Sequence, residues 1–312
     1  MMRSSFIGRS TAIAAASVLA LAFGCSSADD KLAGPGAIHG GGTTTTTGTT
    51  STSTSTGAGG GDVGPCGAPG YGGGEKAQMV ETADADVVDG EGAPLLDYFV
   101  TLCSLDLCIN GVTDGTGHAR IEHFGKMKKP AFKLGDGAVH VKMAVPAGPS
   151  PVIALAGPIW LPALPSKGAP LAAGQTATSG DVSVTLAKDA TLEFELEHYP
   201  THAMQELRAV ALPVDKSAAL IDGEGLEIVY GVGPTNTKIC PPATVSVPNS
   251  LGWDAGQEVD FFLHGVNVEQ DFAPYAGWAR IAGGKVSADG KAIETLAGEG
   301  FPVLGVIGLK RR

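Results

Sequence analysis

The chain has 312 residues, of which 43% are hydrophobic and 17% are charged, and its formal net charge is −11. This composition excludes a wholly disordered chain and supplies enough apolar residues for a sizeable core. The acidic balance excludes nucleic acid as a partner, because such binding depends on lysines and arginines that neutralise phosphates.

The first 24 residues have the pattern of an export signal. Arg3 and Arg9 give a basic start, and the short apolar stretch 10–23 leads through small residues to Cys25. This arrangement resembles a bacterial lipoprotein signal, in which that cysteine is acylated and becomes the mature N-terminus. The resemblance implies that residues 1–24 are removed and that acylated Cys25 anchors the chain in the cell envelope, where we expect it in the outer membrane.

Residues 25–75 have the composition of a flexible tether. Residues 43–56 are almost all threonine and serine, and glycines follow at 57–61. Such a segment has nothing to bury, so we expect it to be disordered. Beyond the signal, no apolar run approaches the ~20 residues that a spanning helix needs. The acylated Cys25 is therefore the expected attachment to the membrane.

Four cysteines remain once Cys25 is assigned to the lipid anchor. An even number of cysteines in an exported protein indicates disulfides, and their spacing is not that of a zinc site. Three pairings are possible. Cys103 and Cys108 are close enough for a local loop, in which case Cys66 and Cys240 would tie the start of the folded region to its second half.

The first predicted domain, 76–165, has short β-rich runs separated by glycine-containing turns. Residues 87–95 form a strand, an Asp-Gly turn and the entry to the next strand, which 98–103 continues. Residues 111–121 predict a hairpin with a glycine-rich tip, and 139–145 alternate as a further strand.

The runs VVDGEGAPLLDYFVTLC and GVTDGTGHARI in this domain resemble the carboxypeptidase regulatory-like, or transthyretin-like, domain. Asp89 to Leu95 correspond to the entry motif of that family, and Thr113 to Ile121 to its hairpin. The resemblance implies a small antiparallel sandwich that serves as a structural appendage without chemistry of its own.

The second predicted domain, 170–312, contains more alternating runs at 8–15-residue spacing, among them 181–186 and 258–263, which favours another sandwich. In 191–197, period two predicts that three glutamates face solvent and that the apolar residues between them face the core. Those glutamates are Glu193, Glu195 and Glu197. The predicted fold class is thus all-β, with two β-sandwich-like domains after the signal and tether.

A second resemblance supports this domain order. Residues 247–259 and 283–300 are similar to the region that follows the transthyretin-like domain in Rhs/YD-repeat and teneurin-type surface proteins. The YD-repeat shell of those proteins is absent, so any toxin-carrying role does not carry over.

Catalytic signatures are missing from the chain. There is no G-x-S-x-G nucleophile motif and no histidine pair in an H-E-x-x-H setting. We therefore predict no enzyme, no cofactor and no metal site. Two alternatives stay open: a glycosidase-like carboxylate pair in 191–197, and a calcium site in the acidic turn that contains Asp84, Asp86 and Asp89.

Aromatic residues gather between positions 253 and 278, and this makes them candidates for a binding surface. The candidates are Trp253, Phe272, Tyr275 and Trp278. Loop aromatics suit contact with carbohydrate or protein, and packing in the core is the alternative. The function predicted is a non-catalytic, lipid-anchored envelope module for structure or binding, with an envelope protein or glycan as partner. The alternative is a carbohydrate-active accessory protein or weak hydrolase.

Overall fold

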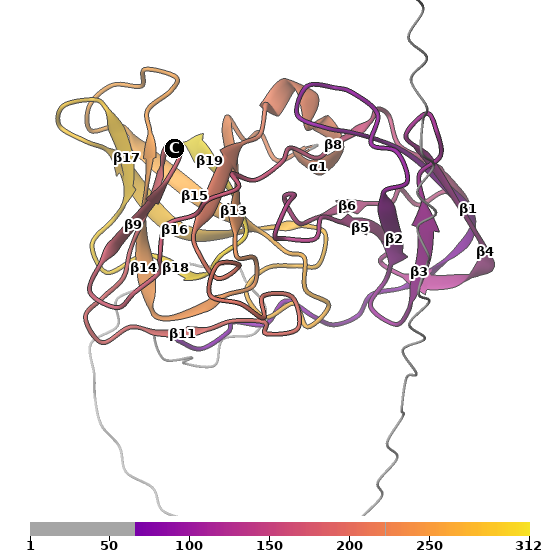
Figure 1. The fold of residues 1–312 in the computed structure, drawn as a ribbon, viewed down its shortest axis with the longest axis horizontal. Helices are drawn as coiled ribbons and strands as arrows, with labels where there is room; N and C mark the ends of the chain where they lie inside the picture. The colour runs from indigo at the N-terminus through magenta and orange to yellow at the C-terminus, as the bar shows by residue number, and fades with distance from the viewer. Residues whose placement is uncertain (1–65, 222) are drawn as a thin grey trace, which may run out of the picture. The chain divides into compact units, whose positions relative to one another are not determined.

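Strands are the main regular structure in the described part of the chain, which is residues 66–221 and 223–312 of a computed structural model (Figure 1). The helical segments in this part are the 3-10 turn η1 (Val214–Lys216) and the one-turn helix α1 (Ala218–Ile221). The predicted all-β fold class is confirmed. No helix among these residues is long and apolar enough to cross a membrane.

Two four-stranded sheets form the first half of the fold. In one, β1 (Ala77–Val88) pairs with β4 (His118–Lys128) on one side and with β7 (Val152–Ala154) and β8 (Ile159–Trp160) on the other. The other has the order β3 (Cys108–Val112), β2 (Phe99–Cys103), β5 (Ala131–Leu134), β6 (Met143–Pro146). One buried cluster, with Val87, Leu102 and Phe132 among its members, joins the two sheets.

The predicted hairpin at 111–121 is wrong in its pairing, although the turn is present. Strand β3 pairs with β2 and strand β4 pairs with β1, so the turn connects two sheets. The Asp114 carboxylate accepts the N–H groups of Thr116 and His118, at 2.7 and 3.1 Å, and closes the turn. At Gly117 (φ +80°), an added Cβ would lie 2.8 Å from the Val87 carbonyl oxygen. Glycine therefore lets the turn pack directly on β1.

The second half is built on one eleven-stranded sheet. Its main order is β12 (Arg208–Ala211), β13 (Ile228–Gly233), β19 (Val306–Arg311), β15 (Glu258–His264), β16 (Trp278–Val286), β17 (Ala292–Thr295), β14 (Lys238–Pro248), β10 (Val182–Thr185), β9 (Thr176–Ser179). Strands β11 (Thr191–Glu193) and β18 (Phe301–Val303) both pair with β14.

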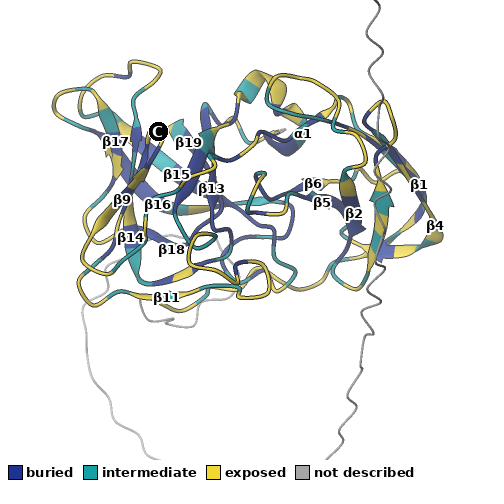
Figure 2. Cartoon of the chain, viewed as in Figure 1, coloured by how far each residue is buried: buried dark blue, intermediate teal, exposed yellow. Residues whose placement is uncertain are grey.

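The two edges of this sheet approach each other, so the sheet is nearly closed into a barrel. Edge strand β12 donates its Ala209 N–H to the Ser179 hydroxyl of edge strand β9, at 3.1 Å. Inside the curve, Phe261 and Phe301 meet edge to face, with ring centroids 5.9 Å apart. Figure 2 shows the buried residues concentrated on these strands. Curling of the sheet thus encloses the core of the second half and shortens the exposed edge.

The cores of the two halves are continuous. The cluster between the two small sheets also contains Leu220, Val229 and Phe262, which come from the second half. The proline-rich stretch 157–168, which connects the two halves, contributes Ile159 and Leu161, both almost completely buried. The described residues of both halves accordingly belong to one compact unit.

The predicted tether ends earlier than residue 75. The Gly70 and Tyr71 N–H groups donate to the carbonyl oxygens of Asp271 and Gln270, at 2.9 and 2.8 Å. The Gln270 side chain in turn donates to Glu75, at 3.0 Å. These bonds hold the last part of the predicted tether against the loop between β15 and β16. The predicted signal and lipidation residue Cys25 lie outside the described residues.

Candidate functional site

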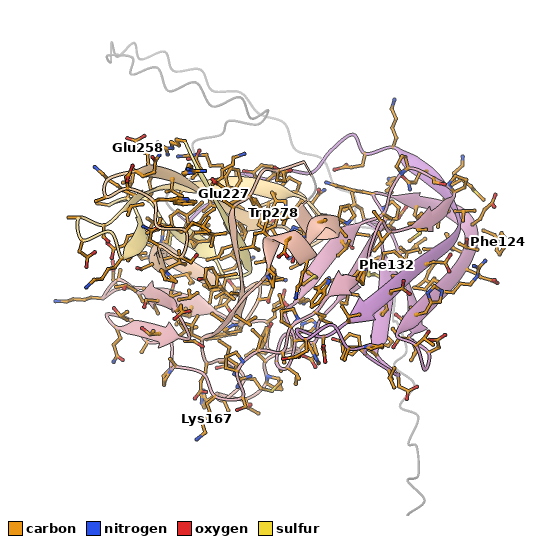
Figure 3. The ribbon with its side chains drawn as sticks, turned by 90° about the horizontal axis from the view of Figure 1, so that it is seen from above. Phe124, Phe132, Lys167, Glu227, Glu258 and Trp278 are labelled. Carbon is orange, nitrogen blue, oxygen red and sulfur yellow. A yellow bond between two sulfur atoms is a disulfide. The ribbon has the colours of Figure 1, made fainter. Side chains whose placement is uncertain are left out.

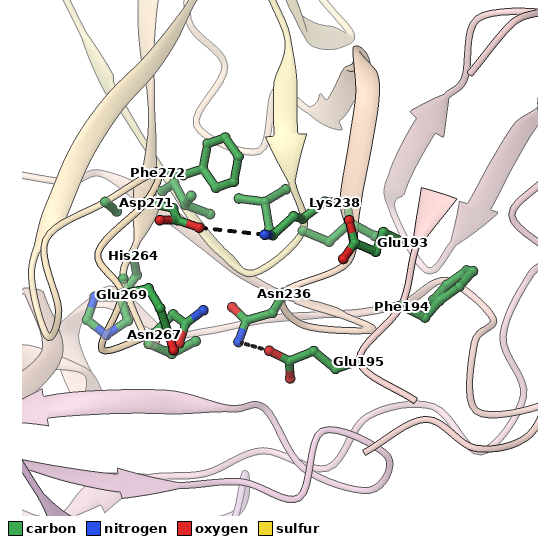
Figure 4. Close-up of a pocket in the computed structure, with 16 residues that line it drawn as sticks. Glu193, Phe194, Glu195, Asn236, Lys238, His264, Asn267, Glu269, Asp271 and Phe272 are labelled. Atoms are coloured by element: carbon green, nitrogen blue, oxygen red, sulfur yellow. Dashed lines mark hydrogen bonds and ion pairs between the residues drawn. The ribbon is translucent and has the colours of Figure 1, made fainter. Parts of the chain in front are cut away.

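A cavity of about 300 Å³ opens among the loops of the second half (Figure 4). Its walls come from the end of β11, the turn between β13 and β14, the connection between β15 and β16, and the end of β18. The polar side chains on these walls are Glu193, Glu195, Asn236, Lys238, His264, Asn267, Glu269 and Asp271. Phe194 and Phe272 supply apolar edges. The cavity thus combines several polar groups with two aromatic rings.

The connection between β15 and β16 takes a course that only glycine allows at its start. The Gly265 N–H donates to the Gly277 carbonyl at 2.8 Å, and a Cβ on Gly265 would lie 2.1 Å from the Pro274 carbonyl oxygen. Gln270, with φ +54°, accepts the Tyr275 N–H on its side-chain oxygen at 3.1 Å. These contacts fix the loop that carries Asn267, Glu269 and Asp271 onto the cavity wall.

Glu195 reaches the cavity because the predicted strand 191–197 ends early. Strand β11 pairs with β14 only as far as Glu193, and the Tyr199 N–H then donates back to the Glu195 carbonyl at 2.9 Å. The alternation breaks at this turn, and Leu196, expected inside, is 65% exposed. The prediction of one solvent-facing row of glutamates is therefore wrong for Glu195.

Three groups surround the Glu195 carboxylate. Asn236 donates its amide N–H to one oxygen at 2.9 Å. The Lys142 ammonium lies 3.6 Å and the His198 Nδ1 3.2 Å from the other oxygen. Burial and the nearby Lys142 lower the pKa of His198. Lys142 comes from the first half of the fold, so this glutamate also joins the two halves.

The cavity lining carries an excess of negative charge. Four carboxylates face one ammonium, that of Lys238, which pairs with Asp271 at 3.6 Å. His264 adds no charge at neutral pH, because its complete burial lowers the pKa to about 4. Its Nε2 lies 2.9 Å from the Ala144 carbonyl oxygen on edge strand β6. The lining therefore suits a ligand with hydrogen-bond donors or positive charge.

The predicted aromatic binding surface is not present, because these side chains pack inside. Tyr275 is fully buried and donates its hydroxyl to the Cys103 carbonyl at 3.3 Å. Trp253 and Phe272 are also buried, although Phe272 borders the cavity. Trp278 is half-buried beside α1, where its indole N–H donates to the Leu220 carbonyl at 3.0 Å (Figure 3). Their apolar area goes into the core, which is the alternative that the sequence left open.

The four cysteines form two pairs, in agreement with the predicted disulfides. Cys103 pairs with Cys108, across the hairpin of β2 and β3, and Cys66 pairs with Cys240 on β14. Of the three pairings that the sequence left open, this is the one with a local loop and a long-range bond.

The acidic turn considered for calcium has other partners. On β1, Asp86 and Asp84 lie 2.8 and 3.3 Å from the ring nitrogens of His118 on β4. The hydrogen bond to Asp86 raises the pKa of His118. Asp89 accepts the N–H groups of Glu91 and Ala93 and closes its own turn. Within residues 66–312, apart from 222, no group of three or more acidic, histidine or cysteine side chains is placed to hold a metal ion.

Comparison with known proteins gives no further guidance, because no family model, curated protein or solved structure matches this chain. The cavity must therefore be interpreted from its own chemistry. The sequence pointed to Glu193 and Glu195 through their period-two spacing. It carried no signal for Asn236, Glu269 or Lys142, which the fold brings to the same place from separate loops.

Proposed function

We propose that this chain is an exported, lipid-anchored envelope protein whose folded part is a non-catalytic binding module for glycans. The signal pattern that ends at Cys25 supports the anchor, and the threonine-rich segment supports a spacer between membrane and module. The resemblance of the first half to a transthyretin-like domain supports a role without chemistry.

The observation that carries the glycan proposal is the composition of the cavity. Its carboxylates accept hydrogen bonds, and its two asparagine amides both donate and accept. Sugar hydroxyls do the same, whereas an apolar ligand would leave these groups without partners. The rings of Phe194 and Phe272 offer apolar surface to the C–H faces of a sugar.

The alternative of a weak hydrolase rests on Glu193 and Glu195, which line the same cavity. A glycosidase needs one carboxyl group that gives up a proton and one that acts as base or nucleophile. Glu195 is already held by the Asn236 amide and lies beside the Lys142 ammonium, so its carboxylate is fixed in place by the protein, which suits a binding group. Binding is therefore the function that the cavity supports best.

The glycan proposal can be tested with the mature chain that carries Cys25→Ser, which keeps it free of lipid. On a panel of envelope glycans we expect the unaltered cavity to bind at least one, and Asn267→Ala with Glu269→Ala to weaken that binding by about tenfold or more. Both side chains line the cavity, and neither makes a side-chain hydrogen bond or ion pair in the described part of the chain, so we expect the variant to fold.

The matched control for this test is Glu122→Gln on β4, whose carboxylate is exposed and lies outside the cavity. It removes one negative charge and should leave glycan binding unchanged. Binding to no glycan, or equal binding by the cavity variant, would contradict the proposal. Release of reducing ends that is lost in Glu193→Gln would instead favour the hydrolase.

The anchor has a separate test. In cells, Cys25→Ser should move the protein from the membrane fraction to the soluble exported fraction, because one acylated residue is the expected membrane attachment. Membrane fractionation and immunoblotting measure this. Ser27→Ala is the control, because it changes a residue near the anchor without removing the cysteine and should leave the protein in the membrane fraction. Retention of the Cys25→Ser chain in membranes would rule out this anchor.

A further inference from the structure

A second cavity, of about 330 Å³, lies on the first half of the fold beside β2 and β5. Two lysines, Lys133 and Lys142, line it together with His198 from the second half. Lys142 is only 5% exposed, and Lys133 is half-buried. Two ammonium groups in such a place are costly unless an anion compensates them, because burial removes their hydration.

The carboxylates of the protein compensate these lysines only in part. Lys142 has one acidic partner, Glu195, and their charged atoms are 3.6 Å apart, which is longer than a direct hydrogen bond. For Lys133, no carboxylate of the described residues lies within 4 Å. Burial lowers the pKa of Lys133 and the neighbouring Lys142 lowers it further, whereas Glu195 and Glu269 raise it from beyond ion-pair distance. The protonated Lys133 therefore has no carboxylate of the described residues in direct contact.

The remaining acid of this cavity, Asp136, is occupied by its own turn. Its carboxylate accepts the N–H groups of Ala138, Val139 and His140 at distances between 2.6 and 3.1 Å. It therefore holds the loop between β5 and β6 rather than pairing with a lysine. An incoming anion would meet Lys133 without displacing this carboxylate.

One edge of the cavity is apolar and open. Phe99 lines it and is 56% exposed, and its partner across the β2–β3 pair, Val112, is equally exposed. Tyr98 also lines the cavity and stacks edge to face on His140, with ring centroids 5.2 Å apart. Apolar surface next to buried cations suits a molecule with an oxyanion at one end and an apolar body at the other.

We propose that Lys133 and Lys142, with the apolar edge at Phe99, form a binding site for an amphiphilic oxyanion, which is a carboxylate or a phosphate monoester on an apolar chain. The oxyanion would sit between the two ammonium groups, and the chain would lie on Phe99 and Val112. The site is distinct from the acidic cavity, and Glu195 separates them, because it lines that cavity and also pairs with Lys142.

Titration calorimetry on the mature Cys25→Ser chain tests this site with octanoate, octyl phosphate and inorganic phosphate as probes. We expect both octyl compounds to bind, and inorganic phosphate to bind at least tenfold more weakly, because it cannot use the apolar edge. Tighter binding of octyl phosphate than of octanoate would indicate a phosphate ligand, and the reverse a carboxylate ligand. Failure of both octyl compounds to bind at millimolar concentration would overturn the proposal.

Variants separate this site from general attraction to lysines. Lys133→Gln should weaken octyl phosphate binding by about tenfold or more, and Phe99→Ser should weaken it while leaving the affinity for inorganic phosphate unchanged. Both side chains are partly exposed, so these variants should fold, which circular dichroism checks. Lys167→Gln is the matched control, since Lys167 projects from the surface (Figure 3) and does not line this cavity. Equal loss in Lys133→Gln and Lys167→Gln would overturn the proposal.

Discussion

At the scale of single residues, His264 shows how burial changes the chemistry of a side chain. It ends β15 and places its ring against edge strand β6, where its Nε2 lies within hydrogen-bond distance of the Ala144 carbonyl. The ring thus satisfies a backbone group at the edge of a sheet from the other half of the fold. Protonation would put an uncompensated charge in the core, and this explains why the pKa falls to about 4.

His264 gives the protein a defined loss of stability in mild acid. The pKa is about 4 in the folded chain and about 6.5 in the unfolded chain, so the unfolded chain binds more protons between these values. The contribution of His264 is complete above pH 6.5 and is lost as the pH falls toward 4. Between neutral pH and a pH below 4, this difference in pKa lowers the free energy of unfolding by about 3 kcal/mol.

Urea unfolding at pH 7.5 and pH 4.5 measures this effect. His264→Gln, whose amide nitrogen can replace Nε2, should remove most of the difference between the two pH values. His202→Gln is the control, because that histidine is exposed, and this variant should lose stability between the two pH values as the unaltered protein does. A pH dependence that is the same with and without His264 would contradict the prediction.

The aromatic residues show what single residues do not reveal before the fold is known. A tyrosine in a loop with proline and glycine is as consistent with a binding surface as with a core. The sequence therefore could not show whether Tyr275 is exposed or buried. The deciding contact, its hydroxyl on the Cys103 carbonyl, joins positions 172 residues apart. Such long-range contacts have no local pattern, so they are visible only in the folded chain.

At the scale of elements, the sequence predicted strands well where alternation was strict. Residues 181–186 contain β10, 98–103 contain β2, and 258–263 coincide with most of β15. It failed where pairing depends on a distant strand. Strands β3 and β4 follow each other across a short turn and still join different sheets. Local turn chemistry fixes the turn but not the partner of each strand.

The same limit applies to the cavity. Glu195 and Asn236 meet because β11 ends at Glu193, and nothing within 191–197 marks that end. Of the lysines of the second cavity, Lys133 lies on β5 and Lys142 directly precedes β6, and the pairing of these two strands, Leu134 with Met143, was not predicted. The sequence could therefore indicate some members of each site but not the site.

The long-range disulfide is the element-scale feature with the largest expected effect on stability. Cys66 and Cys240 are 174 residues apart, whereas Cys103 and Cys108 are 5 apart. In the chain-entropy account, closing the long loop stabilises the fold by up to about 5 kcal/mol and closing the short one by about 2 kcal/mol. Cys66→Ser with Cys240→Ser should therefore lower the free energy of unfolding more than Cys103→Ser with Cys108→Ser.

Hydrogen exchange adds a local measurement to this comparison. Without the Cys66–Cys240 bond, the amides of Gly70 and Tyr71 should lose protection, because their bonds to the β15–β16 loop depend on that attachment. The variant without the Cys103–Cys108 bond should keep this protection and serves as the control. Equal stability and equal protection in the two double variants would contradict the prediction.

At the scale of the whole molecule, the two halves keep separate sheets but share one core. Phe262 on β15 and Val306 on β19 belong to the same buried cluster as Met143 and Ile159 of the first half. We predicted a boundary between two domains near residue 165, and no sheet of the described residues contains strands from both sides of it. The packing nevertheless ties the stability of each half to the other, because each covers apolar surface that the other would expose.

This shared core predicts that the two halves unfold together. Trp160 lies in the first half and Trp253 in the second, so chains in which Trp278 and one of these two are replaced by phenylalanine report on each half by fluorescence. Their urea transitions should have the same midpoint, as a two-state transition requires. Phe262→Ala should shift both midpoints downward together, because it removes about 3–5 kcal/mol of packing from the shared cluster.

Leu196→Ala is the control for this experiment, because Leu196 is 65% exposed and its truncation should leave both midpoints nearly unchanged. If the Trp160 and Trp253 signals have different urea midpoints in chains that keep Phe262, the halves are independent domains. The same conclusion follows if Phe262→Ala lowers the Trp253 midpoint and leaves the Trp160 midpoint unchanged.

Coupled unfolding has a consequence for binding as well. Glu195 and Lys142 come from different halves, so both cavities exist only while the shared core holds those halves in place.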